Sequence, residues 1–279
     1  MKIKECMKKF VAFILAAVCI ILFSVGCSSG GYEELSTRVN YKNSRPASSG
    51  VKTTDKDING APSSGKRVAI TFDDGPHNIR TKAIVDELTK YDFNATFFVI
   101  GNRVDGNAYN GSGAVKYAFS HGNEIAIHGY THAVYYHNCE PERYKLELSK
   151  TYEAIKSVVP DADVRLMRPI GGVITDERVA ECPYSVVTWS VDSEDWKNKG
   201  RGEDDEYARQ NVDTIVENVM SKVKSGDIIL MHDIYENTYE AAKIILARLH
   251  EEGYDVVSVS ELLGNTEPGV KYSRLSTKS

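Results

Sequence analysis

From Lys66 to about residue 260, short apolar runs alternate with longer amphipathic stretches, and this alternation constrains the fold. The apolar runs have strand length, and the amphipathic stretches carry apolar residues at helical spacing. Strands are predicted at residues 68–72, 95–100, 124–127, 164–167, 184–189, 227–231 and 255–259, and helices at 79–91, 114–120, 140–158, 206–223 and 240–251. Repeated strand–helix alternation predicts a parallel sheet, and so many units favour closure into an α/β barrel.

Residues 1–27 have the pattern of a bacterial export signal. Four lysines and one glutamate give this segment a net charge of +3, and an apolar run from Phe10 to Phe23 follows them. The run is shorter than the roughly 20 residues that span a bilayer comfortably. The residues up to Cys27 resemble a lipobox, in which the cysteine is acylated, although Ser24 stands where an aliphatic residue is usual. An uncleaved anchor helix is the alternative, and both interpretations predict an extracytoplasmic, membrane-tethered protein.

The rest of the chain divides by composition. Residues 28–65 are polar and rich in Ser and Gly, which predicts a flexible spacer. A single folded domain is expected over residues 66–264, and the polar residues 265–279 predict a loose tail. The chain has a formal net charge of −5, and because the leader carries +3 the remainder carries −8. An acidic body matches nucleic acid poorly, so no nucleic-acid partner is expected and a neutral or basic substrate is favoured.

The five cysteines do not suggest a thiolate metal site, because no Cys-x-x-Cys pair occurs. Cys6 and Cys19 belong to the leader, and Cys27 is the expected lipid site. Cys139 and Cys182 remain for the folded domain. They either form one disulfide or stay as two free thiols, and the sequence does not decide between these alternatives.

Polar clusters follow several of the predicted strands. The first is Asp73-Asp74, which ends the strand at residues 68–72 and precedes a Gly-Pro turn. Active sites of α/β sheets and barrels are built at the carboxyl ends of strands. An ordinary acidic turn would give the same local sequence, so this cluster indicates an active site only in combination with the other clusters.

The second cluster contains His128 and His132, just past the strand at 124–127. Two histidines four residues apart can bind one ion, although such a spacing often arises by chance. With an acid from the first cluster they make a set of three ligands and leave a position open for water. That is the layout of a catalytic rather than a structural zinc site.

Three further positions carry polar side chains near strand ends. Arg168 follows the strand at 164–167 and could orient a carboxylate, although a solvated arginine is the simpler interpretation. The acids that include Asp195 lie between Trp189 and Trp196, and tryptophan packs well on sugar rings. His232 ends the apolar run at 228–231, where it is either a structural residue or, beside a metal, a general acid.

Taken together, these clusters resemble the polysaccharide deacetylase family, the NodB homology domain of carbohydrate esterase family 4. They occur in the family's order from Lys66 to about Leu263, and the motif from Thr71 to Pro76 is highly specific. So is the closing stretch from His232 to Leu262. The resemblance implies a distorted (β/α) barrel of TIM-like type with a single catalytic domain.

The resemblance also implies roles for individual residues. Asp74, His128 and His132 would bind one divalent metal ion, which is expected to be zinc. Asp73 would be the base for the attacking water activated by the metal, and His232 would protonate the leaving amine.

The remaining implied roles concern orientation and substrate binding. Arg168 would orient the base, and Asp195 would steady Arg168. The backbone N–H of Gly171 would hold the oxyanion, while Trp196 and Leu230 would form a pocket for the acetyl methyl group.

The chain departs from the family pattern at a few positions around the site. Ile170 and Gly171 stand where Pro and Tyr are common, and Ala133 replaces the usual Pro after the second histidine. These departures leave the reacting groups in place and alter the substrate subsites.

The expected function is a hydrolase that removes N-acetyl groups from N-acetylglucosamine units of a cell-surface polysaccharide, with peptidoglycan favoured. Chitin oligomers, poly-N-acetylglucosamine and O-acetylated xylan are alternatives, the last requiring an esterase. A hypothesis of another class is an inactive glycan-binding lipoprotein, which would lack a base, an acid or a metal ligand; the sequence lacks none of them. An amidase of small molecules is a third possibility.

Overall fold

The computed structural model describes residues 65–106, 111–197 and 206–275. The chain divides into two compact units, Met1–Asp57 and Ile58–Ser279, and every described residue lies in the second unit. The predicted leader, its lipobox cysteine and the predicted spacer up to residue 64 lie outside the described residues. Among the residues that are described, no helix combines the length and the apolar character needed to span a bilayer.

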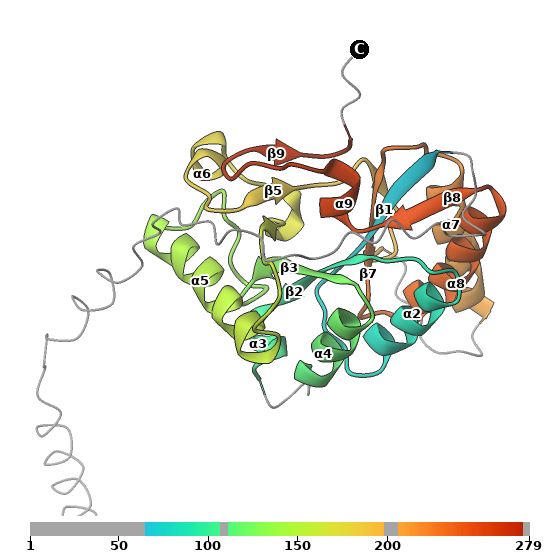
Figure 1. Cartoon of the computed structure of the whole chain (residues 1–279), viewed down its shortest axis with the longest axis horizontal. Coiled ribbons are helices and arrows are strands. Elements are labelled where there is room, and N and C mark those ends of the chain that lie inside the picture. Colours follow the sequence, from blue (N-terminus) through green and yellow to red (C-terminus); the bar gives the residue numbers. More distant parts are fainter. Residues whose placement is uncertain (1–64, 107–110, 198–205, 276–279) are drawn as a thin grey trace, which may run out of the picture. The chain divides into compact units, whose positions relative to one another are not determined.

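The described residues form a sheet of nine strands (Figure 1). The strands are β1 (Lys66–Asp73), β2 (Thr96–Ile100), β3 (Glu124–Gly129), β4 (Leu166–Met167), β5 (Ser185–Val187), β6 (Val191–Asp192), β7 (Ile228–His232), β8 (Tyr254–Val257) and β9 (Lys271–Tyr272). Their order is β6-β7-β1-β2-β3-β4-β5-β9, and β8 pairs with the first half of β1. These strands pair in parallel, so their carboxyl ends share one edge of the sheet.

β1 lies in the middle of the sheet, and its pairing sets the neighbours of Asp73. It pairs with β2 and with β7, and Asp73 lies beside Phe98 on one side and His232 on the other. A parallel sheet therefore brings residues more than 150 positions apart to neighbouring strand ends. β3 pairs in parallel with β2, so the end of β3 at Gly129 lies at the same edge of the sheet.

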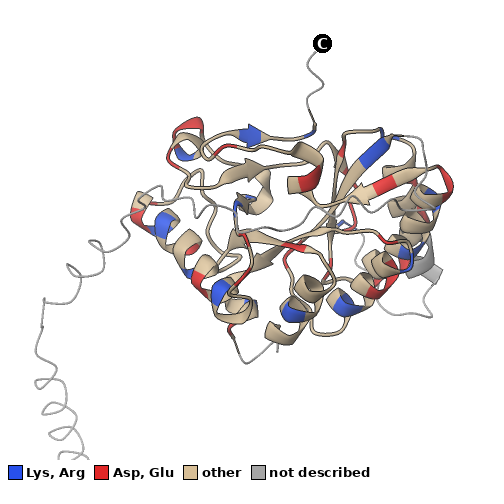
Figure 2. Cartoon of the chain, viewed as in Figure 1, with Lys and Arg blue, Asp and Glu red and all other residues tan. Residues whose placement is uncertain are grey.

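Helices follow one another around the outside of the sheet (Figure 1). They are α2 (Arg80–Thr89), α3 (Gly101–Val104), α4 (Ser112–Ser120), α5 (Pro141–Val158), α6 (Asp176–Ala180), α7 (Glu206–Met220), α8 (Glu236–Glu251) and α9 (Val259–Leu263), with a 3₁₀ turn, η1 (Ile170–Gly172). α5 begins with Pro141, whose missing N–H would have had no partner in the helix. Acidic and basic residues are both present along the helices (Figure 2), as expected of solvated helix faces.

The sheet divides the apolar core into two parts. The larger cluster lies between sheet and helices and includes Val68, Ile70 and Phe72 of β1 with Ile84 and Leu88 of α2. The smaller one includes Ala69, Phe98 and Ile228. Because successive side chains of a strand point to opposite faces, Asp73 shares a face with Ala69, and His232 shares a face with Ile228. The side chains of Asp73 and His232 therefore lie on the face of the sheet that carries the smaller cluster.

The predicted parallel α/β sheet and its distorted barrel form are confirmed. The barrel is open, because no pairing joins β6 to β9 among the described residues. The differences concern short elements: α3, α6, α9, β6 and β9 were not predicted, and residue 259 begins α9 rather than ending a strand. β9 lies in the predicted tail, where it pairs with β5. Elements of two to five residues are shorter than the stretches over which hydrophobic periodicity can be recognised, so their sequences carry no clear pattern.

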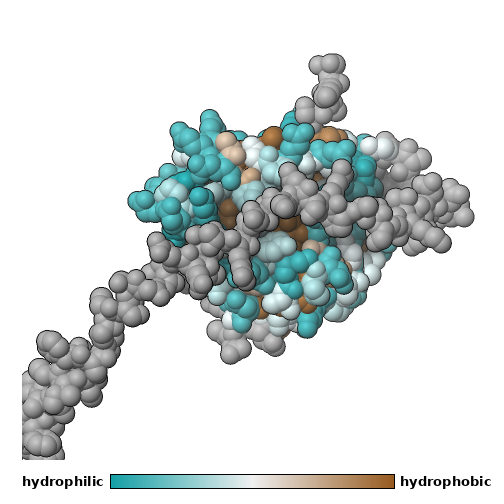
Figure 3. All heavy atoms as spheres, turned by 60° about the vertical axis from the view of Figure 1, so that its left-hand side comes forward, coloured by the Kyte–Doolittle hydropathy of each residue, from teal (hydrophilic) through white to brown (hydrophobic). Residues whose placement is uncertain are grey.

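Two features of the surface and interior bear on the sequence predictions. Cys139 and Cys182 are free thiols, partly exposed and buried respectively, which agrees with the second of the two alternatives. The face shown in Figure 3 is mainly hydrophilic where described residues are visible, with hydrophobic residues in scattered patches. Single exposed apolar residues are normal on a protein surface, whereas a contiguous apolar patch can mark a binding site.

Candidate active site

Asp73 and Arg168 form a buried ion pair at the carboxyl end of β1. Arg168 Nη1 lies 2.8 Å from Asp73 Oδ1, and the two side chains are 0% and 4% exposed. The guanidinium lies 4.1 Å from the ring centroid of Phe98. Its other hydrogen bonds go to the hydroxyl of Thr71 and to the carbonyl groups of Val187 and Thr188. Arg168 is therefore fixed, and it holds one oxygen of Asp73.

Asp74, His128 and His132 each direct one ligand atom toward a common point. These atoms lie within 4.8 Å of one another, and Asp74 Oδ1 is 3.4 Å from His128 Nε2 and 3.0 Å from His132 Nε2. His128 Nδ1 donates to the carbonyl oxygen of Arg168 at 2.9 Å. That bond places the ring proton on Nδ1 and leaves the Nε2 lone pair toward Asp74. The structure thus brings the three predicted ligands together.

This donor set fits a divalent metal ion. Asp74 Oδ1 is buried, and no hydrogen-bond donor among the described residues satisfies it. A buried carboxylate oxygen without a partner is costly, and a cation would supply the missing interaction. One carboxylate and two imidazoles are ligands that zinc accepts, and three protein ligands leave a coordination position open. The side chain of His132 is 47% exposed, so the site can be reached from solvent.

Glu147 of α5 fixes the loop that carries the two histidines, a contact that no sequence motif indicates. Its Oε2 accepts the backbone N–H of Tyr130 at 2.9 Å and that of Thr131 at 2.7 Å. The Glu147 side chain is only 2% exposed. The available signal was its position between Tyr144 and Leu148, on the face of α5 that turns inward. An acid at such a position needs a buried partner, and here the partner is the loop between His128 and His132.

The predicted role of Asp195 is wrong in one respect. It was expected to steady Arg168, yet its carboxylate binds His232: Oδ1 lies 2.8 Å from Nδ1, and Oδ2 accepts the backbone N–H at 2.7 Å. The reason is register, because the β6–β7 pairing brings the segment after β6 beside the end of β7. Burial lowers the pKa of His232, but the hydrogen bond and charge of Asp195 and the charge of Asp73 outweigh it and raise the pKa to about 9.

The three predicted substrate-contacting residues lie at the same edge of the sheet. Gly171 is part of η1 and has a φ of 68°, a left-handed conformation that favours glycine. Leu230 is buried on the inner face of β7, two residues before His232. Trp196 follows Asp195 and is 44% exposed. Each residue of the His232–Asp195 pair therefore has one of the two predicted pocket residues close to it in sequence.

Asp233 is a second residue whose contacts the sequence pattern does not reveal. It is fully buried, and its Oδ2 accepts a hydrogen bond from the hydroxyl of Thr81, whose oxygen in turn accepts the N–H of His77 at 2.8 Å. Burial, opposed by the Thr81 bond and aided by the charge of Asp74, raises the pKa of Asp233 to about 7. This chain of contacts ties the end of β7 to the start of α2 and to the loop after Asp74.

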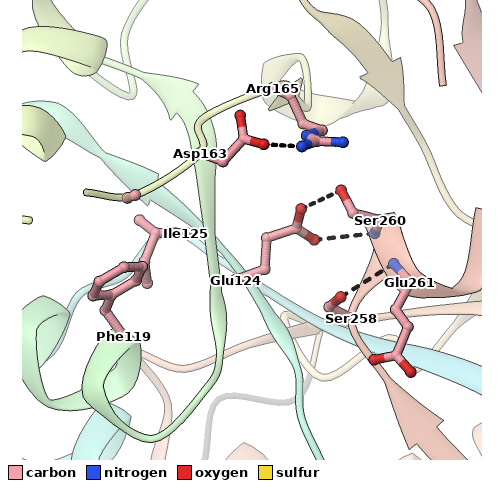
Figure 4. Close-up of a pocket in the computed structure, with 9 residues that line it drawn as sticks. Phe119, Glu124, Ile125, Asp163, Arg165, Ser258, Ser260 and Glu261 are labelled. Atoms are coloured by element: carbon pink, nitrogen blue, oxygen red, sulfur yellow. Dashed lines mark hydrogen bonds and ion pairs between the residues drawn. The ribbon is translucent and has the colours of Figure 1, made fainter. Parts of the chain in front are cut away.

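A pocket at the opposite end of the strands is structural. It has a volume of about 390 Å³, and Glu124, the first residue of β3, lies in its wall (Figure 4). Oε2 of Glu124 accepts from the Thr96 hydroxyl at 2.7 Å and from the backbone N–H of Ser260 at 3.2 Å. The acid is therefore satisfied, and it joins β2 and β3 to α9. Features at the amino ends of barrel strands generally serve stability.

Comparison with known proteins identifies relatives of the folded domain. The family model for polysaccharide deacetylases matches residues 60–187. The chain is 37% identical over 210 residues to the peptidoglycan-N-acetylglucosamine deacetylase of Bacillus cereus, a match that covers 72% of this chain and 90% of that protein. A solved structure described as a T48 deacetylase with substrate superposes with a TM-score of 0.65 at 30% identity, covering 75% of this chain and 96% of the other.

A longer relative is also similar over the folded domain. The chain is 35% identical over 197 residues to the peptidoglycan-N-acetylmuramic acid deacetylase PdaC of Bacillus subtilis. That match covers 71% of this chain but 38% of the relative. The chain therefore spans well under half the length of PdaC, and the similarity concerns the domain that contains the site.

Proposed function

This chain belongs to the polysaccharide deacetylase family, and on that basis we propose that it hydrolyses N-acetyl groups of a cell-surface polysaccharide. The favoured substrate is the N-acetylglucosamine of peptidoglycan. One observation carries the proposal: the Asp73–Arg168 pair, the Asp74–His128–His132 cluster and the His232–Asp195 pair meet at one edge of the sheet. A base, a set of metal ligands and a proton donor are the groups that amide hydrolysis needs.

Asp74, His128 and His132 would hold the metal ion, with zinc as the expected ion. When bound, a divalent ion polarises a carbonyl group and lowers the pKa of a water ligand from 15.7 toward about 7. Arg168 occupies Oδ1 of Asp73, whereas Oδ2 lies 3.7 Å from His128 Nε2 and faces the cluster. Asp73 Oδ2 is therefore the atom that takes the proton from the attacking water.

His232 completes the reaction from the other side of β1. Its Nδ1 is held by Asp195, so Nε2 is the nitrogen that donates a proton to the leaving amine. Breaking the C–N bond without that proton would release an amide anion, which is a very poor leaving group. The raised pKa of His232 keeps the ring protonated at neutral pH. The N–H of Gly171 would stabilise the oxyanion, and Leu230 and Trp196 would enclose the acetyl methyl group.

The location of the protein follows from the N-terminal sequence. We propose that the leader directs export and that Cys27 carries a lipid, so that the enzyme is tethered outside the cytoplasm near the cell wall. The names of two relatives refer to peptidoglycan but to different sugars, N-acetylglucosamine and N-acetylmuramic acid. Both sugars are therefore tested as substrates, beside chitin oligomers and acetylated xylan.

The direct test is acetate release by the full-length protein from peptidoglycan, chitin oligomers and acetylated xylan, with chelation and zinc add-back. We expect release from peptidoglycan that chelation abolishes, that zinc restores and that Asp74→Ala lacks. Mass spectrometry of the digested muropeptides identifies the sugar that has lost its acetyl group. Glycan binding without acetate release from any of these polymers, by a zinc-loaded folded protein, would support the glycan-binding alternative instead.

A further inference from the structure

Tyr135 lies over Gly171, beside the backbone that would bind the oxyanion. A Cβ atom added to Gly171 would lie 3.3 Å from Tyr135 Cε1 and 3.8 Å from Cδ1, so the ring is in van der Waals range of this backbone. Tyr135 is nevertheless 45% exposed. Its sequence position is three residues after His132, one of the metal-ligand candidates. An aromatic ring is thus exposed to solvent at the rim of the active site.

The neighbouring residue anchors this ring. Tyr136 is fully buried, and its ring packs edge-on against that of Tyr144 with centroids 5.0 Å apart. A Cβ atom on Gly129 would lie 2.6 Å from Tyr136 Oη, so the Tyr136 side chain reaches under the end of β3. Tyr135 therefore points outward from a segment whose next side chain is held in the core. A platform that is already in place loses little conformational entropy when a ligand binds.

The two glycines of η1 make room for aromatic rings on both sides of the turn. Gly171 and Gly172 have φ values of 68° and 73°. A Cβ atom on Gly172 would lie 2.5 Å from Trp189, which covers that glycine, as Tyr135 covers Gly171. Trp189 is half-buried and also contacts the Arg168 guanidinium at 5.6 Å, so its role is structural. Among the described residues, the ring of Tyr135 packs edge-on against that of His137, with centroids 6.1 Å apart, rather than on Arg168. Its exposed part faces solvent.

We propose that Tyr135 binds the substrate glycan by stacking on a pyranose ring, next to the sugar unit that is deacetylated. This inference rests on the proposed function. The C–H face of a pyranose is apolar and matches the ring of a tyrosine, while the hydroxyl can remain in contact with water. Val173, which follows the glycine turn, is 50% exposed and extends the apolar surface in the same region. Because Tyr135 lies beside Gly171, a sugar on it would position its neighbour at the proposed oxyanion contact.

The test compares variants of Tyr135 in the zinc-loaded full-length protein. Binding of chitopentaose is measured by calorimetry in an Asp73→Asn background, and hydrolysis is measured in the active background. We expect Tyr135→Ala and Tyr135→Leu to weaken binding about tenfold and Tyr135→Phe to bind as the parent does, because stacking needs the ring and not the hydroxyl. In the active background KM should rise by a similar factor, while kcat changes by less than about twofold.

The matched control is Ile244→Ala on α8, which removes another exposed apolar side chain, 40% exposed, from the helical surface. It should leave both binding and hydrolysis unchanged. Parent-like binding by Tyr135→Leu, or binding by Tyr135→Phe as weak as that of Tyr135→Ala, would overturn the stacking role. If the parent protein releases no acetate, the proposed function fails, and the calorimetry still decides whether Tyr135 binds the sugar.

Discussion

The carboxylate of Asp195 binds both the imidazole ring and the backbone N–H of His232. Oδ1 of Asp195 lies 2.8 Å from the imidazole Nδ1, and Oδ2 accepts the backbone N–H of His232 at 2.7 Å and the hydroxyl of Thr238 at 2.6 Å. The aspartate is fully buried. This arrangement fixes the ring orientation and favours the imidazolium form, as expected for a residue that delivers a proton to a leaving group.

Replacing Asp195 should move the alkaline limit of activity. A general acid works only when protonated, so activity falls as pH rises through the pKa of His232, which is raised to about 9. In Asp195→Asn the carboxylate charge is lost, the pKa of His232 falls, and the alkaline limb of the kcat/KM profile should shift to lower pH. Asp192→Asn, a nearby acid with a local hydrogen bond to Glu194, is the control and should not move the limb. An unchanged limb in Asp195→Asn would exclude His232 as the acid.

The Asp73–Arg168 pair should be strongly coupled. Arg168→Met leaves Asp73 buried without its cation, and we expect a loss of about 3–5 kcal/mol in the free energy of unfolding. Adding Asp73→Asn removes the unpaired charge, so the double variant should be more stable than Arg168→Met alone. Urea denaturation of the two single variants and the double variant measures the coupling. Arg165→Met, at a half-exposed arginine paired with Asp163, serves as the control. Additive effects would mean that the pair is not coupled.

Glu147 is not a candidate metal ligand, but it should affect the affinity for the metal by holding the loop between two of the ligands. Its carboxylate holds the N–H groups of Tyr130 and Thr131, which lie between the two histidines. Removing a residue that supports metal ligands typically lowers affinity about 10–100-fold. We therefore expect Glu147→Ala to bind zinc at least about tenfold more weakly in competition with a chromophoric chelator. Glu153→Gln, an exposed position on the same helix, is the control, and equal affinities of the two variants would contradict the role of Glu147.

The sequence could predict those parts of the fold that have a long enough pattern. The strands around Ile70 and Ile229 are continuous apolar runs, and α5 shows helical spacing over 18 residues, so their existence and type were clear. Parallel pairing then places Asp73 next to His232. Two-residue strands such as β6 and β9 carry no periodicity, and their position depends on tertiary contacts.

The partners of the polar residues were harder to predict. Which group Asp195 binds depends on the register of β6 with β7, and a sequence pattern does not contain that register. The sequence also does not show that Glu147 accepts the N–H of Thr131, because the two residues lie in different elements. Nor does it show that Tyr135 lies next to Gly171, which belongs to another loop. Motifs therefore singled out the polar residues of the candidate site, whereas the contacts that orient them required the three-dimensional structure.

Metal binding should stabilise the fold through the same three residues that are expected to hold the ion. Asp74 and His128 are buried, and Asp74 Oδ1 accepts no well-formed hydrogen bond among the described residues. A ligand that binds only the folded state at 100 times its Kd adds about 2.7 kcal/mol to the free energy of unfolding. Zinc should therefore raise the Tm of the wild-type protein, and chelation should reverse the increase. Asp74→Ala should show no such shift. A zinc-dependent increase in Tm that persists in Asp74→Ala would place the ion elsewhere and remove the support for this ligand set.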